Sequence, residues 1–248
     1  MGTQLDKTVW DQPRLANLHH QPDKARRVQA MFDDIAPTYE LVNRVLSAGR
    51  DAYWRRCAVK MADVRSDDHV LDLACGTGDF AREFARAGPD MIVGSDFAPA
   101  MLALGAARGT GAIHWCRADA LAMPYGDGSF TIVSCAFGVR NFQSLSRGLE
   151  EIHRVLAPGG RAVILEFTMP KAPVLAKLYL LCFRHILPRV ARLISRDRSG
   201  AYDYLPQSVA SFIDAGGMIE ALNSAGFSSV QHRPLTLGIV TVYVARKV

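Results

Sequence analysis

The sequence predicts an α/β fold with a doubly wound, mostly parallel sheet and an antiparallel last strand. Apolar segments of strand length alternate with helical segments along most of the chain, which is typical of a parallel sheet with helices on both faces. The last two apolar segments are separated by a short turn from Pro234 to Gly238, which indicates a hairpin. The expected strands are residues 69–74, 91–95, 113–117, 130–136, 161–167, 228–234 and 238–245.

Helical periodicity precedes and separates these strands. Apolar residues recur at helical spacing from Ala25 to Met61, with an interruption at Pro37, and predict an N-terminal helical cap. Residues 1–25 are polar and predict a flexible tail, so the folded domain is expected to cover residues 26–248. The other expected helices are residues 79–87, 99–107, 144–156 and 208–225.

A long insertion, residues 168–207, follows the fifth expected strand and is predicted to be a substrate lid. Within it, residues 174–187 are strongly apolar but contain Lys177 and Arg184, so this segment is too short and too charged to span a bilayer. It has the character of a basic amphipathic lid that covers a lipid or contacts an anionic membrane. The alternative is a helix packed on the core with solvated arginines at its end.

Length and composition bound the class of protein. A chain of 248 residues with 49% hydrophobic and 21% charged residues predicts one large globular domain. The net charge is +5, but no Lys/Arg block alternates with aromatic residues, so nucleic-acid binding is not expected. Five widely spaced cysteines predict neither a metal site nor a disulfide framework. We expect a cytoplasmic location, and leave open a peripheral contact with the inner face of the membrane and a homo-oligomer.

The most informative segment is a glycine-rich turn between the first expected strand and a helix. A dinucleotide would favour G-x-G-x-x-G, whereas here two glycines lie between acids that repel phosphate and suit a cation. S-adenosylmethionine (SAM) carries an ammonium and a sulfonium group, and the turn resembles the SAM-binding loop of class I methyltransferases. We therefore expect SAM as cofactor, with contacts from Asp72, Gly76, Thr77 and Gly78.

Residues that follow later strands complete the expected cofactor site. Asp96 ends the second strand 18 residues after Gly78, close to the offset of a carboxylate that binds ribose hydroxyls. Asp119 and Ala120 close the third strand, where an adenine amino group would find an acceptor. Two further expected cofactor contacts are Met101 and Ala136.

Three motifs outside the turn resemble the ubiquinone/menaquinone biosynthesis C-methyltransferases, over about residues 28–248. The family pattern F-D-x-I-A-x-x-Y-D-x-x-N…S-x-G…W-[KR] is matched between Phe32 and Arg55, except that Glu40 replaces Asp. The pattern R-V-L-K-P-G-G…E-F is matched at residues 154–160 and 166–167, with Ala157 for Lys. The pattern S-F-G-[LV]-R-N is matched at residues 136–141, with Ala136 for Ser, and Cys75 stands where Gly is frequent.

The resemblance implies methyl transfer from SAM to a ring carbon of a polyprenylated quinol, from demethylmenaquinol to menaquinol. A benzoquinol precursor of ubiquinone is the alternative substrate, because the same motifs serve both rings. Another small-molecule methyltransferase and a non-catalytic SAM-fold scaffold are the remaining alternatives. The resemblance assigns the chemistry to Arg140, Asn141 and Tyr39, with Glu166 as a further residue that faces the site or forms a salt bridge.

Overall fold

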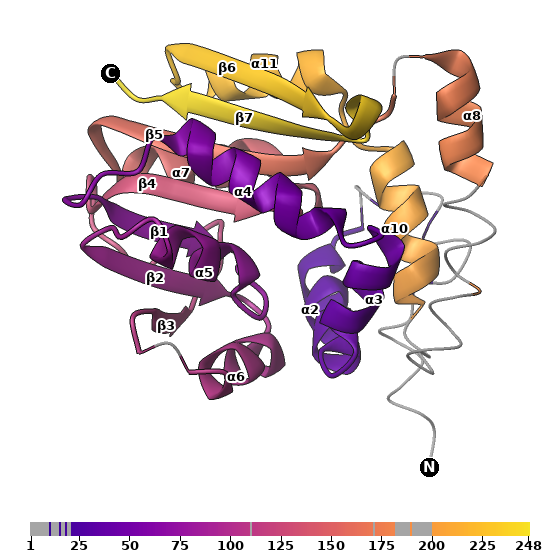
Figure 1. Ribbon diagram of the computed structural model, residues 1–248, viewed down its shortest axis with the longest axis horizontal. Helices are drawn as coiled ribbons and strands as arrows, with labels where there is room; N and C mark the ends of the chain where they lie inside the picture. Colours follow the sequence, from indigo (N-terminus) through magenta and orange to yellow (C-terminus); the bar gives the residue numbers. More distant parts are fainter. Residues whose placement is uncertain are drawn as a thin grey trace.

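The computed structural model describes residues 10, 15, 18, 21–109, 111–170, 172–181, 189 and 200–248. Its centre is a seven-stranded sheet with the order β3-β2-β1-β4-β5-β7-β6 (Figure 1). Strands β1 to β5 are parallel to one another, while β7 runs antiparallel to β5 and to β6. The strands are β1 (His69–Leu73), β2 (Met91–Asp96), β3 (His114–Arg117), β4 (Phe130–Ala136), β5 (Leu156–Phe167), β6 (Ser229–Leu235) and β7 (Val240–Arg246).

This topology confirms the expected mostly parallel sheet with an antiparallel last strand. From β1 the chain continues outward to β2 and β3, then returns to the other side of β1 as β4. The strand order therefore reverses between β1 and β4. In such sheets the crevice at the carboxyl ends of the two strands is where ligands bind.

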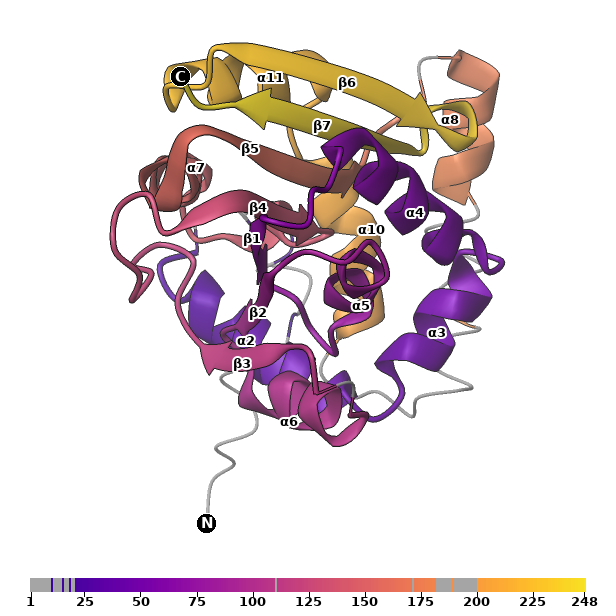
Figure 2. The ribbon, with the colours of Figure 1, turned by 60° about the vertical axis from the view of Figure 1, so that its left-hand side comes forward.

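Helices cover both faces of the sheet because alternate strand residues are apolar on both sides. Val70 packs in a cluster with α4 and α5, and its neighbour Leu71 packs in a cluster with α7 and α11. Figures 1 and 2 show these helix pairs on opposite faces. The helices are α4 (Arg50–Ala62), α5 (Asp79–Ala85), α6 (Pro99–Ala107), α7 (Leu145–Val155) and α11 (Ala215–Ser224).

A separate group of helices lies beyond the carboxyl ends of the parallel strands (Figures 1 and 2). It consists of α2 (Lys24–Ile35), α3 (Tyr39–Leu46), α8 (Pro173–Leu181) and α10 (Ala201–Ala210). These helices share a hydrophobic cluster with one another and with α6. Helices α2 and α3 confirm the expected N-terminal cap, whereas α4, expected as part of it, packs on a face of the sheet. Helix α8 and most of helix α10 come from the insertion at residues 168–207 and complete the group beyond the strand ends.

Two expectations about these segments were wrong. Residues 208–225 are not one helix, because the Asp214 side chain accepts the N–H of Gly217 at 2.8 Å and starts a new helix, α11. At the other end of the chain, the expected tail contains Trp10, Leu15 and Leu18, which are only 2–6% exposed. Single apolar residues among polar ones carry no periodicity, so their packing was not visible in the sequence. Within the described residues, no helix has the length and apolar character of a transmembrane span.

Candidate active site

A first cavity lies at the carboxyl ends of β1, β2 and β4. Six of the nine residues expected to bind cofactor line this cavity, together with Phe97, Leu121, Phe137 and Gly138, which the sequence did not single out. Helix α2 covers it through side chains such as Val28. The six expected residues are Gly76, Asp96, Met101, Asp119, Ala120 and Ala136.

Gly76 gives the backbone of the glycine-rich turn an open approach from this cavity. Its φ is +57°, and a Cβ there would meet only the Tyr39 ring, at 3.9 Å. Its N–H donates to Asp96 Oδ2 at 2.7 Å. The cavity therefore reaches the main chain of the turn, as a ligand with a charged amino-acid part requires.

Gly78 packs against the Trp115 ring and does not line the cavity. A Cβ at Gly78 would lie 2.3 Å from the Trp115 ring, and this ring also fills the space beside Gly94 and Gly105. Together with a φ of +85°, this overlap explains the glycine without any ligand. The expected cofactor contact of Gly78 has no support in the lining of the cavity.

Asp72 and Thr77 also lie outside the lining of the first cavity. Asp72 is fully buried and accepts the Ser134 hydroxyl at 2.7 Å, and burial raises the pKa of Asp72 to about 7. The Thr77 hydroxyl donates to Glu40 Oε1 at 2.5 Å, which ties the turn to α3. The side chains of Asp72 and Thr77 therefore hold the turn from the side away from the first cavity.

Asp96 is the best-oriented acid in the first cavity. Its Oδ1 accepts the N–H of Ala98 at 2.8 Å, and its Oδ2 accepts the N–H of Gly76. Burial raises the pKa of Asp96, and these backbone donors act in the opposite direction. Each carboxylate oxygen accepts more than one hydrogen bond, so Asp96 retains capacity for ligand hydroxyls.

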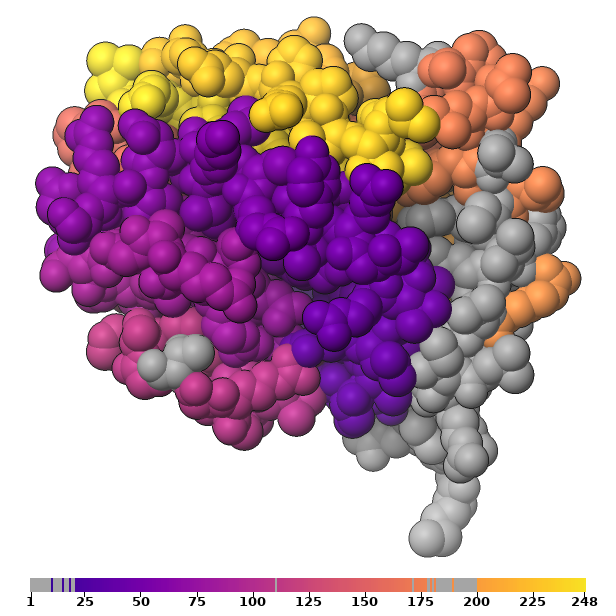
Figure 3. Space-filling model, viewed as in Figure 1, coloured from indigo at the N-terminus to yellow at the C-terminus, as the bar shows by residue number. Residues whose placement is uncertain are grey.

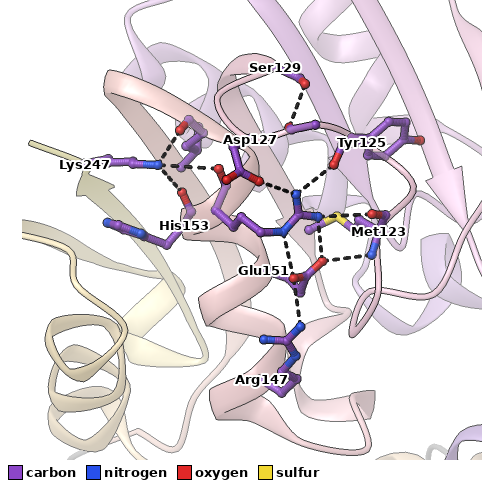
Figure 4. A network of polar contacts seen from close by, with 11 residues as sticks. Met123, Tyr125, Asp127, Ser129, Arg147, Glu151, His153 and Lys247 are labelled. Atoms are coloured by element: carbon purple, nitrogen blue, oxygen red, sulfur yellow. Dashed lines mark hydrogen bonds and ion pairs between the residues drawn. The ribbon is translucent and has the colours of Figure 1, made fainter.

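The loop that forms one wall of the first cavity is held in place by an ionic network outside the cavity (Figure 4). Asp119 begins a loop, and Arg154 donates to the carbonyls of Met123 at 3.1 Å and Tyr125 at 2.8 Å within that loop. Glu151 accepts from Arg154 at 2.9 Å and from the N–H of Met123 at 2.9 Å. Arg154, from the second motif, therefore supports the cavity wall without contacting the cavity.

A second cavity opens on the other side of Tyr39. Phe32, Tyr39 and Phe137 line both cavities, so these three rings form the partition between them. The remaining walls are mainly aromatic and apolar and come from α2, α3, α4, α8, α10, the end of the β6–β7 hairpin, the end of β5 and the segment after β4. They include Met31, Ile35, Leu46, Trp54, Phe167, Tyr179, Tyr202, Tyr204 and Ile239.

Arg140, in the short helix η3 (Val139–Asn141) after β4, lines the second cavity. Its Nη1 donates to Glu166 Oε1 at 2.8 Å and to the Phe137 carbonyl at 2.6 Å, and its Nε lies 3.4 Å from Ser208 Oγ. Within the described part of the chain, Nη2 has no hydrogen-bond partner. Nη2 is the donor that remains for a ligand.

Arg140 keeps its positive charge despite its burial. Burial disfavours the guanidinium, but the Glu166 carboxylate outweighs this effect and holds the pKa of Arg140 above its ordinary value. Burial also raises the pKa of Glu166, and Arg140 opposes that shift. The expectation that Glu166 forms a salt bridge is confirmed, with Arg140 as partner.

Tyr39 lines both cavities, and Asn141 and its neighbour Arg140 are joined by hydrogen bonds to the helices beyond the strand ends. Burial raises the pKa of Tyr39, so its hydroxyl stays protonated at neutral pH and acts as a donor. Asn141 lines the first cavity, accepts the Tyr204 hydroxyl at 2.9 Å and donates to the Phe137 carbonyl at 3.2 Å. Lys24 donates to the carbonyl of Arg140 at 3.0 Å and fixes η3 against α2.

Sequence reasoning did not select Arg55 as a site residue, although it belongs to the first family motif. Arg55 lines the second cavity, is buried, and donates from Nη1 to Asp51 at 2.6 Å. Its Nε is buried and has no hydrogen-bond partner among the described residues. The neighbouring Trp54 is buried, lines the same cavity and donates to Thr236 Oγ1 at 2.7 Å.

Three comparisons with known proteins agree with this architecture. The ubiE/COQ5 methyltransferase family matches residues 20–247. The demethylmenaquinone methyltransferase of Deinococcus radiodurans is 46% identical over 230 residues, which covers 91% of this chain and 94% of that protein. The ubiquinone/menaquinone biosynthesis C-methyltransferase UbiE of Geobacter sulfurreducens is 42% identical over 241 residues, with 94% and 93% covered.

Similarity to solved structures shows the fold and leaves the reaction open. The [4+2]-cyclase SpnF superposes with a TM-score of 0.66 at 17% identity, over 90% of this chain and 96% of that one. A cyclase on the same fold illustrates that the site, and not the fold, decides the chemistry. The sequence motifs and the extent of the family match give the stronger assignment. The chain therefore belongs to the ubiE/COQ5 methyltransferase family.

Proposed function

We propose that this protein binds SAM in the first cavity and methylates a ring carbon of a polyprenylated quinol in the second. The observation that carries the proposal is the shared partition of Phe32, Tyr39 and Phe137 between the two cavities. Because the same three rings line both cavities, the cavities adjoin there, and direct transfer requires a gap between these rings through which the acceptor carbon meets the methyl group. Holding both reactants at this border in a favourable approach supplies much of the acceleration in methyl transfer.

The first cavity fits SAM by its chemistry. The open approach at Gly76 suits the amino-acid part, and the oriented carboxylate of Asp96 suits the ribose hydroxyls. Asp119 and Ala120, with Phe97 and Leu121, offer an acceptor and apolar surfaces for adenine. When bound, SAM supplies an electrophilic methyl group on a positively charged sulfur.

The second cavity fits an aromatic, apolar acceptor. Arg140 Nη2 would hold one quinol oxygen as an anion, and the oxygen's negative charge increases electron density at the adjacent ring carbon. With SAM held in the first cavity, that carbon would accept its methyl group, and the sulfur would leave as a neutral thioether. The ring proton then passes to water, because Arg140 and Tyr39 both hold their own protons at neutral pH.

We also propose that the insertion at residues 168–207 covers the acceptor. Tyr179, Ala201, Tyr202 and Leu205 from this insertion line the second cavity. Residues 182–188 and 190–199 lie outside the described part of the chain. Demethylmenaquinol is the proposed substrate because the Deinococcus radiodurans relative carries that name, and a benzoquinol precursor is the alternative that the Geobacter sulfurreducens name includes.

The test is a methylation assay with purified protein, SAM and two short-chain quinols, one naphthoquinol and one benzoquinol, kept reduced by dithionite. We expect a product heavier by one methylene from the naphthoquinol, detected by mass spectrometry. Product from the benzoquinol alone would transfer the assignment to ubiquinone biosynthesis. SAM binding by calorimetry without product from either ring would favour another acceptor or a non-catalytic scaffold.

A further inference from the structure

The mouth of the second cavity can be located from its lining. The lining residues are buried or half-buried except Ala48 and Arg50, which are exposed and lie at the turn from α3 to α4. Thr236 and Ile239, from the end of the β6–β7 hairpin, line the same cavity, and so does Tyr179 from α8. Figure 3 shows the hairpin end next to α4 and α8 on one face of the molecule.

Leu237 protrudes from the hairpin end beside this mouth. Its side chain is 77% exposed, between the two lining residues Thr236 and Ile239. Thr236 and Leu237 have φ angles of +47° and +58°, a left-handed conformation that residues other than glycine rarely adopt. Strained backbone that presents a large apolar side chain to water is a feature that folding alone does not explain.

Helix α8 presents a second apolar surface next to the hairpin end. Val174, Lys177 and Leu181 lie three and four residues apart, so they share one face of the helix, and all three are exposed. Tyr179 lies on another side of α8 and lines the second cavity. A Cβ built on Gly238 would lie 3.7 Å from Pro170 Cα, so the segment that leads into α8 packs against the end of the hairpin.

Positive charges surround these apolar side chains. The Cys57 thiol raises the pKa of the exposed Tyr53 hydroxyl, and Arg233 and Arg50 oppose that shift, so the edge strand β6 and α4 bring two cations near Tyr53. Lys177 adds a third from α8. Among the residues that the structure describes, no carboxylate lies within ion-pair distance of these three cations.

We propose that this surface docks on an anionic lipid bilayer, with Leu237, Tyr53, Val174 and Leu181 in the headgroup region and Arg50, Lys177 and Arg233 against lipid phosphates. Exposed apolar side chains mixed with basic ones are the combination that binds an anionic interface. The inference rests on the proposed function in one respect, since a lipid acceptor needs a path from the bilayer to the cavity. When the protein is docked in this way, the mouth of the second cavity faces the membrane, and the isoprenoid tail of the acceptor can pass from the bilayer into the cavity without exposure to water.

The test is co-sedimentation of the full chain with vesicles of phosphatidylcholine containing roughly one third phosphatidylglycerol. Leu237→Ser should lower the partition coefficient about 10-fold, because a large apolar side chain no longer enters the interface. Arg233→Gln should lower it about 5-fold on these vesicles and leave binding to pure phosphatidylcholine unchanged. Val248→Ser is the matched control, since Val248 is 87% exposed at the C-terminus, at the opposite end of the molecule (Figure 1).

Each outcome separates this inference from the proposed function. Equal partitioning of Leu237→Ser, Val248→Ser and the unsubstituted chain would overturn the docking surface. Absence of vesicle binding by the folded, unsubstituted chain would overturn it as well. If Leu237→Ser instead dissociates a dimer in sedimentation velocity, the surface belongs to a second copy of the chain. Vesicle binding without methylation of a short-chain quinol would refute the proposed function alone, and methylation without vesicle binding would refute the docking alone.

Discussion

The two cavities carry charges of opposite sign at their walls. In the first, Asp96 and Asp119 present carboxylates, and backbone N–H groups hold Asp96 in place. In the second, Arg140 and Arg55 present guanidiniums, and Glu166 and Asp51 hold them. The first therefore suits a cationic ligand and the second an anionic one. A sulfonium donor and a phenolate acceptor are a pair with these charges.

The two cavities also differ in construction. Most walls of the first come from segments that directly follow parallel strands, so the sheet brings them together. The walls of the second come from helices α2, α3, α4, α8 and α10 and from a hairpin end, which are far apart in the sequence. We expect substitutions in the two cavities to act on different steps.

Gly78→Ala should destabilise the protein by roughly 2–4 kcal/mol, because a Cβ overlaps the Trp115 ring and a left-handed φ disfavours alanine. Gly88→Ala is the matched control, since Gly88 has a φ of +76° with no atom within 4 Å of a Cβ. It should cost only about 1–2 kcal/mol. Chemical denaturation measures both values. Equal losses would show that Trp115 moves aside freely and that the glycine is needed for its φ alone.

Asp96→Ala should weaken SAM binding by about 1.5–3 kcal/mol, the value of hydrogen bonds to a charged group. Calorimetric titration of SAM measures this, and thermal melting checks the fold. Asp90→Ala, an exposed acid outside both cavities, should leave SAM binding unchanged. An unaltered SAM affinity in the Asp96 variant would remove Asp96 from the ribose site.

Asp72→Asn should change how stability depends on pH. The native pKa of Asp72 is raised to about 7 from 3.8, so the folded state binds more protons than the unfolded state between these values. The stability contributed by this group is complete below about pH 3.8 and is lost as the pH rises to about 7. From pH 4.5 to 6.5 the asparagine variant should therefore gain roughly 1–2 kcal/mol relative to the unsubstituted protein. Parallel urea unfolding curves across this range measure the difference, and parallel pH profiles would contradict the prediction.

Arg140→Lys should lower the rate of methyl transfer by about 10-fold or more, or ~1.4 kcal/mol, while SAM affinity is unchanged. Lysine keeps the charge but loses the planar set of donors that contacts Glu166 and the Phe137 carbonyl while leaving Nη2 for a ligand. Single-turnover transfer to a short-chain quinol, measured beside a SAM titration on the same preparation, tests this. Equal rates would make Arg140 structural and pass the role to Tyr39, whereas a loss of SAM affinity would break the separation between the two cavities.

The sequence predicted the mostly parallel sheet with its antiparallel last strand, the approximate bounds of its strands and six of the residues that line the first cavity. This was possible because period-two apolar segments and glycine-rich turns are local signals, and parallel strands necessarily bring their carboxyl ends to one edge. Asp96 and Asp119 could be assigned to one site on that basis, whereas Ala136 was assigned from the family resemblance. The family motifs also identified Arg140 and Tyr39.

Only the tertiary structure decided which members of the glycine-rich turn face a ligand and which face the core. Gly76 and Gly78 are two residues apart and both have positive φ, yet one borders the cavity and the other borders Trp115 from β3. The second cavity, the place of Arg55 in it and the exposed Leu237 were likewise invisible to local patterns. Their neighbours come from distant parts of the chain, and side-chain contacts between such segments are set by packing, which no periodicity in the sequence encodes.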